Sequence, residues 1–484
     1  MQFLRLARPR ICTTAFALIV LCSLAPSQTK AEREFAKSVS TSRLLEQVRE
    51  LVGFGPRTGG TRSGDKAVAY LTRQFKQAGY RPIVEKDPKR LAFELGQWSL
   101  KVDSPRRLRD LVRNEWPGGY SPSVPKSNAS VTYVGLPEIA SPRDLKGKAV
   151  LLDVLPSEKT YRRFAEAGAR CLLLISPTLE GAYSDWAMIS HLPETGTNPI
   201  PLFNLSRNNG VSLKRALKDS LDVVISFSVR TDVDSASPKT VLATLEGKTE
   251  KFYLVCAHGD SDSGGPGADD NASGVSTVLE TARVLNSLVR SGRIPKPQCT
   301  IRFAIWGTEI YSTEHYVKRH ADDLMNLQGV VNLDGVGTGA SRDCIYFESN
   351  DVDYNEHLLR TFETVGEEFA GKKGFWFEST TNPSQGGTDS YVFFPRRLRR
   401  LKVPEIKIPA MTIYTSAWNE RKALPQTPGW SSKAWKGPPD TVLVDFSAYY
   451  HSSLDVPVRT TEREPFNMSG AAKALGIGLS RLAW

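Results

Sequence analysis

The spacing of hydrophobic residues changes along the chain. Between residues 43 and 80, apolar side chains recur at helical spacing on both sides of the turn FGPRTGG, which predicts two helices. After residue 240, short apolar runs alternate with helical stretches, and the runs lie at 252–257, 300–306, 328–333 and 409–414. Strands that alternate with helices predict a parallel sheet covered on both faces. The expected fold class is therefore α/β, with a mixed, mostly parallel sheet sandwiched by helices.

A second set of strands and helices interrupts the first. In this region the segments VTYVG, KAVLLDV, CLLLIS and VVISFSV are typical of strands, with helical segments between them and no cluster of histidine and acidic residues. Residues 96–130 are rich in Pro, Ser and Gly, and we expect them to form a connector. We predict one domain made of residues 32–126 and 235–484, with residues 127–234 inserted as a unit that has its own core.

The first 31 residues differ from the rest of the chain. Three arginines precede the hydrophobic stretch Ala15–Leu24, and polar residues lead to the small Ala31. This order is typical of an export signal cleaved near Ala31. A membrane anchor needs about 18 apolar residues, which neither this stretch nor any later one supplies. The sequence predicts that residues 1–31 are a signal peptide and that the mature protein is exported, extracellular or periplasmic, without a stable membrane span.

The net charge of the chain bears on whether it binds nucleic acid. The whole chain carries +11, and loss of the four basic residues of the predicted signal would leave +7. The densest basic run, PRRLRRLK from Pro395 to Lys402, has no interleaved aromatic residues and matches no nucleic-acid-binding motif. We therefore expect no nucleic-acid partner, and we interpret the run as a solvated loop.

The ends of three predicted strands carry histidine or acidic residues. The strand KFYLVCA leads into His258 and Asp260, TIRFAIWGTE ends in Glu309, and GVVNLDG contains Asp334 at its end. In open α/β sheets, ligands bind beyond the carboxyl ends of the strands, so we expect these side chains at one sheet edge. A His-x-Asp pair also provides an acid that can orient the imidazole. One such acid means little, but three successive strands of this kind predict a functional site.

Two further segments add candidate ligands. PGADDNASGV places Asp269 and Asp270 after a glycine-rich loop and just before a helix. An acid in this position often caps the helix, but capping accounts for one acid and not for a pair. Near the C-terminus, YYHSSLDVP presents His451 in a polar turn. Imidazole and carboxylate donors without thiolate are typical of a hydrolytic zinc site.

The chain resembles the exported zinc exopeptidases of the co-catalytic dizinc aminopeptidase family, which includes glutamate carboxypeptidase. The matching segments, in order, are GPRTGG, AHGDSDS, PGADDNASGV, FAIWGTE, VVNLDGVG, GGTDSYVF and YYHSSLDVP. Residues 127–234 resemble a protease-associated domain, with GKAVLLD, FAEAGARCLLLI and IPLFNLSR in its usual order. The resemblance covers nearly all of the mature chain, and it implies the zinc exopeptidase fold with Zn²⁺ as cofactor.

The resemblance also implies a role for each motif residue. His258 and Asp334 would bind one zinc ion. Asp270 would bridge the two ions, and His451 would bind the second. Asp260 would hold and orient the imidazole of His258 as part of the catalytic machinery.

Glu309 would be the general base that takes a proton from the attacking water and returns it to the leaving amine. The family pattern has a second glutamate directly after it, as a ligand of the second zinc, and this chain has Ile310 there. Three interpretations stay open: one strong zinc site beside a weak or absent one, a substitute ligand such as Glu314, or a binding protein that no longer cleaves peptides, as in the transferrin receptor. The retained ligand and catalytic residues favour catalysis with one strong zinc site.

Asp389 in GGTDSYVF occupies the place of a residue near the substrate cleft in the family, although Ser390 replaces the usual histidine. It is a candidate substrate residue, and an N-cap of a short helix is the alternative. The sequence thus predicts metal-dependent hydrolysis of a peptide or protein substrate, with release of its N-terminal residue. A carboxypeptidase, a glutaminyl cyclase and a non-catalytic binding protein are the alternatives.

Overall fold

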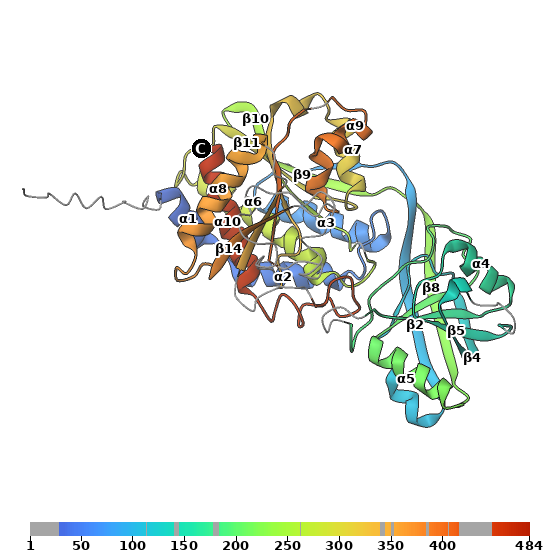
Figure 1. The fold of residues 1–484 in the computed structure, drawn as a ribbon. Coiled ribbons are helices and arrows are strands. Elements are labelled where there is room, and N and C mark those ends of the chain that lie inside the picture. The colour runs from blue at the N-terminus through green and yellow to red at the C-terminus, as the bar shows by residue number, and fades with distance from the viewer. Residues whose placement is uncertain are drawn as a thin grey trace, which may run out of the picture.

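The computed structural model describes residues 29–112, 114–139, 145–177, 183–261, 263–338, 344–349, 353–383, 387–404, 406–415 and 448–484. These residues form two lobes, each built on its own sheet (Figure 1). Most of the predicted signal peptide, residues 1–28, lies outside the described residues. The first described element is α1, Lys30–Ser38, and the side chain of Thr29 caps it.

The larger lobe contains a sheet of eight strands in the order β1-β9-β11-β10-β12-β15-β13-β14. Their bounds are β1 Ile83–Lys86, β9 Lys239–Leu245, β11 Cys299–Trp306, β10 Thr249–His258, β12 Leu327–Leu333, β15 Ala410–Tyr414, β13 Cys344–Ser349 and β14 Glu378–Pro383. The four central strands β11, β10, β12 and β15 are parallel, and the pairs β1–β9, β9–β11 and β13–β15 are antiparallel. The prediction of a mixed, mostly parallel sheet is therefore confirmed.

Helices cover both faces of this sheet (Figure 1). One face packs against α1, α2 Thr41–Gly53, α3 Arg62–Gln77, α6 Gly274–Arg290, α8 Glu356–Phe369 and α10 Phe466–Ala483, and the other against α7 Tyr311–Arg319 and α9 Pro395–Arg400. The central strand β10 has apolar side chains on both faces: Val255 and Ala257 enter the first core, and Leu254 and Cys256 enter the second. Burial on both faces explains why this strand reads as a continuous apolar run.

The second lobe, residues 90–236, contains a sheet of seven strands in the order β2-β8-β4-β5-β6-β7-β3. The bounds are β2 Arg90–Ser104, β8 Val224–Ala236, β4 Val124–Gly135, β5 Lys148–Leu152, β6 Cys171–Ile175, β7 Leu202–Leu205 and β3 Trp116–Pro117. The helices α4 Glu158–Glu166 and α5 Arg207–Lys218 pack on this sheet. Figure 1 shows the lobe beside the larger one, with β2 and β8 running together along it.

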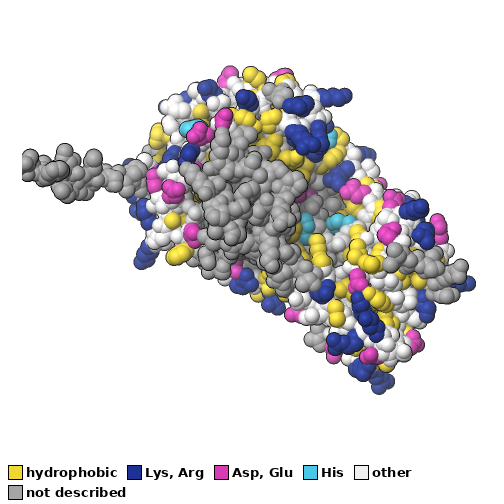
Figure 2. Space-filling model, viewed as in Figure 1, with side chains coloured by type: hydrophobic (Ala, Val, Ile, Leu, Met, Phe, Trp, Pro, Cys, Tyr) yellow, Lys and Arg dark blue, Asp and Glu magenta, His cyan; other side chains and the backbone are white. Residues whose placement is uncertain are grey.

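Two expectations need correction. Residues 96–130 are not a connector, because β2, β3 and part of β4 belong to the second sheet, which begins at Arg90 rather than near residue 127. The pairing of β2 with β8 shifts register between Leu95 and Trp98, which breaks the alternation that would have shown a strand. The basic run from Pro395 is likewise a short helix, α9, with Leu398 buried. Lys and Arg side chains gather near this helix in Figure 2.

Across the described ranges, none of the helices is both long enough and apolar enough to span a bilayer.

Candidate metal centre

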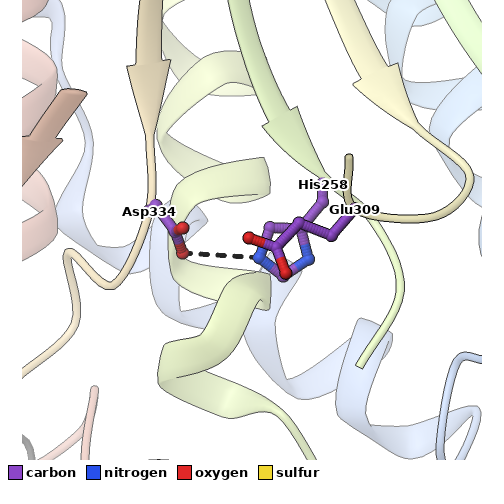
Figure 3. A group of neighbouring side chains, drawn as sticks. All are labelled: His258, Glu309 and Asp334. Carbon is purple, nitrogen blue, oxygen red and sulfur yellow. Dashed lines mark hydrogen bonds and ion pairs between the residues drawn. The ribbon is translucent and has the colours of Figure 1, made fainter. Parts of the chain in front are cut away.

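Three adjacent parallel strands bring His258, Glu309 and Asp334 together at one edge of the larger sheet. His258 is the last residue of β10, and the two acids follow the ends of β11 and β12. One ligand atom from each residue lies within 4.8 Å of the others. Figure 3 shows Asp334 facing the imidazole of His258, with Nε2 and Oδ1 3.4 Å apart, and Glu309 beside the ring. The predicted convergence of these three side chains is therefore observed.

Asp270 lies between two imidazoles. Its Oδ1 is 3.2 Å from Nε2 of His258, and its Oδ2 is 2.9 Å from Nε2 of His451. Burial opposes ionisation of Asp270, but hydrogen bonds from both histidines lower its pKa below the ordinary value. A carboxylate that presents one oxygen to each of two histidines has the arrangement of a ligand shared by two ions.

The charges around His258 favour its protonated form. Burial acts to lower the pKa of His258, but the charges of Glu309 and Asp334 raise it well above its ordinary value. A cation is therefore electrostatically favoured at the Nε2 side of this ring, whether it is a proton or a metal ion.

Asp260 holds the other side of the same imidazole. Its Oδ1 is 3.1 Å from Nδ1 of His258 and also accepts the backbone N–H of Glu309 at 3.1 Å. An acid on Nδ1 leaves Nε2 as the nitrogen available to a ligand. Asp260 therefore links the orientation of His258 to the position of the Glu309 backbone.

The loop that carries Asp270 is fixed by two groups that sequence reasoning did not single out. The guanidinium of Arg57, which is 1% exposed, donates to the carbonyls of Pro266 at 3.0 Å and Gly267 at 2.7 Å. The carboxylate of Asp455 accepts the backbone N–H groups of Asp269 at 2.8 Å and Asp270 at 3.1 Å. Arg57 lies in the motif GPRTGG and Asp455 in YYHSSLDVP, but the sequence does not show that either residue contacts the Asp270 loop.

Asp269 and Asp270 have different roles. Asp269 accepts the backbone N–H of Gly337 at 2.7 Å and the hydroxyl of Thr338 at 2.6 Å, so it ties the loop after β12 to the start of α6. Asp270 alone faces the histidines. Asp269 therefore has a structural role in the described part of the chain.

The residue after Glu309 has an unusual backbone. Ile310 adopts φ +56° and ψ −50°, and its side chain packs against the second core. Its N–H donates to Oδ1 of Asp389 at 2.8 Å, and the hydroxyl of Thr313 donates to the same oxygen. Left-handed φ is rare for a β-branched residue, so the carboxylate of Asp389 holds a strained turn next to Glu309.

Asp389 does not fit its predicted place at a substrate surface. It is fully buried, and burial raises its pKa to about 7. Its Oδ1 accepts the N–H of Ile310, the residue directly after Glu309. Glu314, the nearest substitute ligand by sequence, forms an ion pair with Arg397 and is not part of the group that could hold a metal among the described residues.

The family model of the M28 peptidases (Peptidase family M28) matches residues 240–463. These residues are therefore similar to the M28 peptidases, and over this part of the chain the predicted resemblance is confirmed.

Among curated proteins, the chain is similar to Aminopeptidase YwaD of Bacillus subtilis (27% identical over 263 residues, 52% of this chain and 51% of that protein). It is also similar to an aminopeptidase of Pseudomonas aeruginosa strain UCBPP-PA14 (24% over 326 residues, 62% and 58%). The chain thus spans between half and three-fifths of the length of these relatives.

Two solved structures show the same fold. They are BSAP, a zinc aminopeptidase from Bacillus subtilis (TM-score 0.58, 18% identity, 92% of this chain and 95% of that one), and a peptidase M28 precursor from Shewanella amazonensis SB2B (TM-score 0.61, 19%, 92% and 94%).

Proposed function

We propose that the protein is a zinc-dependent exopeptidase that removes N-terminal residues from peptides. One observation carries the proposal: the two oxygens of Asp270 face the Nε2 atoms of His258 and His451, at 3.2 and 2.9 Å, while Glu309 lies beside the first ring. The names of the similar proteins, which are aminopeptidases, support the direction of cleavage.

The donor set fits zinc. The two imidazoles and the carboxylates of Asp270 and Asp334 are nitrogen and oxygen donors of the kind that hydrolytic zinc sites use. His258 and Asp334 would hold one ion, Asp270 would be shared, and His451 would hold a second. When bound, zinc supplies a Lewis acid that polarises the scissile carbonyl and lowers the pKa of water.

Glu309 would move the proton. It follows β11 at the sheet edge, within reach of the group around His258, and Asp260 fixes its backbone N–H. Its carboxylate would take a proton from the water that attacks the carbonyl carbon. It would then return this proton to the nitrogen of the leaving amine as the C–N bond breaks.

A substitution of Glu309 tests this role. We expect Glu309→Gln to lower kcat on aminoacyl p-nitroanilides by about 10²- to 10⁴-fold while zinc content stays unchanged. Glu462→Gln is the matched control, because Glu462 forms a 2.6 Å surface pair with Arg49 outside the site. Activity should also be lost with a chelator and return with zinc.

Wild-type protein that binds zinc but hydrolyses no aminoacyl, peptidyl or carboxy-terminal substrate would refute the proposal. It would favour the second candidate, a non-catalytic binding protein, which the presence of Ile310 in place of a ligand supports.

We further propose that residues 1–31 direct export and are cleaved near Ala31. The supporting observation is the basic and then hydrophobic order of this segment. N-terminal sequencing of the protein from the extracellular or periplasmic fraction tests it, and an intact Met1 there would count against cleavage.

We also propose that the second lobe is a protease-associated domain. Its β2 and β8 pair along most of their length, so the chain enters and leaves at one place, and the lobe has two cores of its own. A fragment of residues 88–238 should unfold cooperatively on heating, and a fragment without a thermal transition would contradict independent folding.

A further inference from the structure

We propose that the second lobe is part of the metal centre, because it fixes the backbone of the turn that carries His451. Two segments are involved: the junction segment, residues 183–192 of the second lobe, and the His451 turn, residues 448–455 of the larger lobe. The inference rests on the proposed function, since it takes His451 as a metal ligand. It adds a positioning role for residues that contact neither a metal nor a substrate.

Backbone hydrogen bonds join the two segments at His451 and at Ser453. The N–H of Ile189 donates to the carbonyl of His451 itself at 2.8 Å, and the N–H of Ser453 donates to the carbonyl of Ala187 at 2.9 Å. Met188 and Ser452 form an antiparallel bridge between these bonds. The His451 turn is thus paired with the second lobe in the manner of a short strand.

Side chains of the second lobe extend this pairing. The hydroxyl of Tyr183 donates to the carbonyl of Tyr450 at 2.9 Å, and Nε1 of Trp186 donates to the carbonyl of Ala448 at 2.9 Å. The ring of Trp186 also packs on that of Tyr449, with centroids 4.7 Å apart. Three backbone carbonyls of the His451 turn, those of Ala448, Tyr450 and His451, therefore accept hydrogen bonds from the second lobe.

The conformation of His451 explains why the turn needs support. His451 has a φ of +48°, a left-handed value that a non-glycine residue keeps only when its neighbours hold it. The imidazole stacks on the ring of Tyr450, with centroids 3.7 Å apart, and points Nε2 at Asp270. If the peptide on either side turned, the ring would leave this position.

The other end of the turn is tied to the Asp270 loop. Asp455 accepts the N–H groups of Asp269 and Asp270, as described above. The His451 turn is therefore held by the larger lobe at Asp455 and by the second lobe at residues 448–453. Because a ligand displaced by a fraction of an ångström binds its metal less well, loosening the second-lobe side should weaken metal binding through His451.

The test compares zinc binding in variants that delete side-chain donors of the second lobe. Tyr183→Phe and Trp186→Phe, combined, delete two donors and keep an aromatic ring at each position, although the ring at residue 186 becomes smaller. Tyr80→Phe is the matched control, because the hydroxyl of this buried tyrosine also donates to one backbone carbonyl, that of Ala282, at 2.7 Å. Metal-free protein is titrated with Zn²⁺ against a chromophoric chelator, and wild type and His451→Ala provide the two limits.

His451→Ala should abolish zinc binding at the site that includes His451. We expect the double variant to lower the zinc affinity of that site by about tenfold, and to leave the affinity of the site at His258 unchanged. Tyr80→Phe should bind zinc as wild type does, although its Tm should change by an amount similar to that of the double variant. The proposal is overturned if the double variant keeps both affinities within twofold of wild type, or if His451→Ala itself binds zinc like wild type. Because the measurement needs no turnover, its outcome is independent of whether the protein cleaves peptides.

Discussion

Replacement of Asp389 tests how the turn at Ile310 controls Glu309. Asp389→Ala removes the acceptor of two donors, the part-buried N–H of Ile310 and the buried hydroxyl of Thr313. Each donor left unpaired costs about 1–3 kcal/mol, so the free energy of unfolding should fall by about 2–6 kcal/mol. A domain whose stability is about 10 kcal/mol, the middle of the usual range, would still fold.

The effect on turnover follows from the strain at Ile310. A residue held in this region of φ and ψ costs about 1–3 kcal/mol. The two hydrogen bonds to the Asp389 carboxyl, each worth about 0.5–3 kcal/mol across its two protonation states, can offset this cost. Without Asp389 the turn should relax and carry Glu309 with it. A displacement of about 1 Å can reduce a rate by about 10²-fold, so we expect kcat to fall by that factor with little change in KM.

Asp389→Asn is the matched variant, because an amide oxygen can accept from the same two donors. The pKa of Asp389, raised to about 7 by burial, means that the carboxyl is already partly protonated near neutral pH. We therefore expect the asparagine variant to lose about 1 kcal/mol or less and less than tenfold in kcat. The assays are urea denaturation, zinc content and kinetics on aminoacyl p-nitroanilides. An alanine variant with kcat within twofold of wild type would refute the reasoning, and so would an asparagine variant as impaired as alanine.

Three other substitutions have expected outcomes. Asp260→Ala should lower zinc affinity by about 10- to 100-fold in a chelator competition, because the ring of His258 loses its partner; unchanged affinity would contradict this role. Arg57→Met should lower the free energy of urea unfolding by about 3 kcal/mol or more, since buried carbonyls at Pro266 and Gly267 lose their donor. Burial raises the pKa of Glu115 from 4.5 to about 8. The folded protein therefore keeps a proton that the unfolded chain releases, and its stability should fall as pH rises from 5 to 8. Glu115→Gln should remove about 3 kcal/mol of that fall, and an unchanged pH dependence would show that Glu115 is ionised in the fold.

The larger sheet and the first part of the site could be predicted because both depend on local patterns. Buried parallel strands have continuous apolar sequences, and their carboxyl ends meet at one edge of the sheet. The sequence alone therefore predicts that His258, Glu309 and Asp334 lie close together. The start of the second lobe could not be found in this way. The register shift within β2 breaks its alternation, and the strand pairs with β8, more than a hundred residues later in the chain.

The positioning residues escaped prediction for a related reason. Asp389 meets Ile310 across 79 positions of sequence, and Arg57 reaches Gly267 across 210. Neither contact has a periodic signal, because each depends on how loops from different elements pack. The segment GGTDSYVF has the same sequence whether its aspartate contacts a substrate or accepts hydrogen bonds from a neighbouring turn.

The two sides of Asp270 differ in the groups that face them in the described part of the chain. On one side, Asp334 and Asp270 both lie within 3.4 Å of Nε2 of His258, so three protein groups converge. On the other side, His451 and Asp270 form a pair, and the position of a family ligand is taken by Ile310, whose side chain enters the second core. The direction of the His451 imidazole depends on a turn with a φ of +48° whose carbonyls bond to the second lobe. Loosening that contact should therefore weaken metal binding on this side of Asp270.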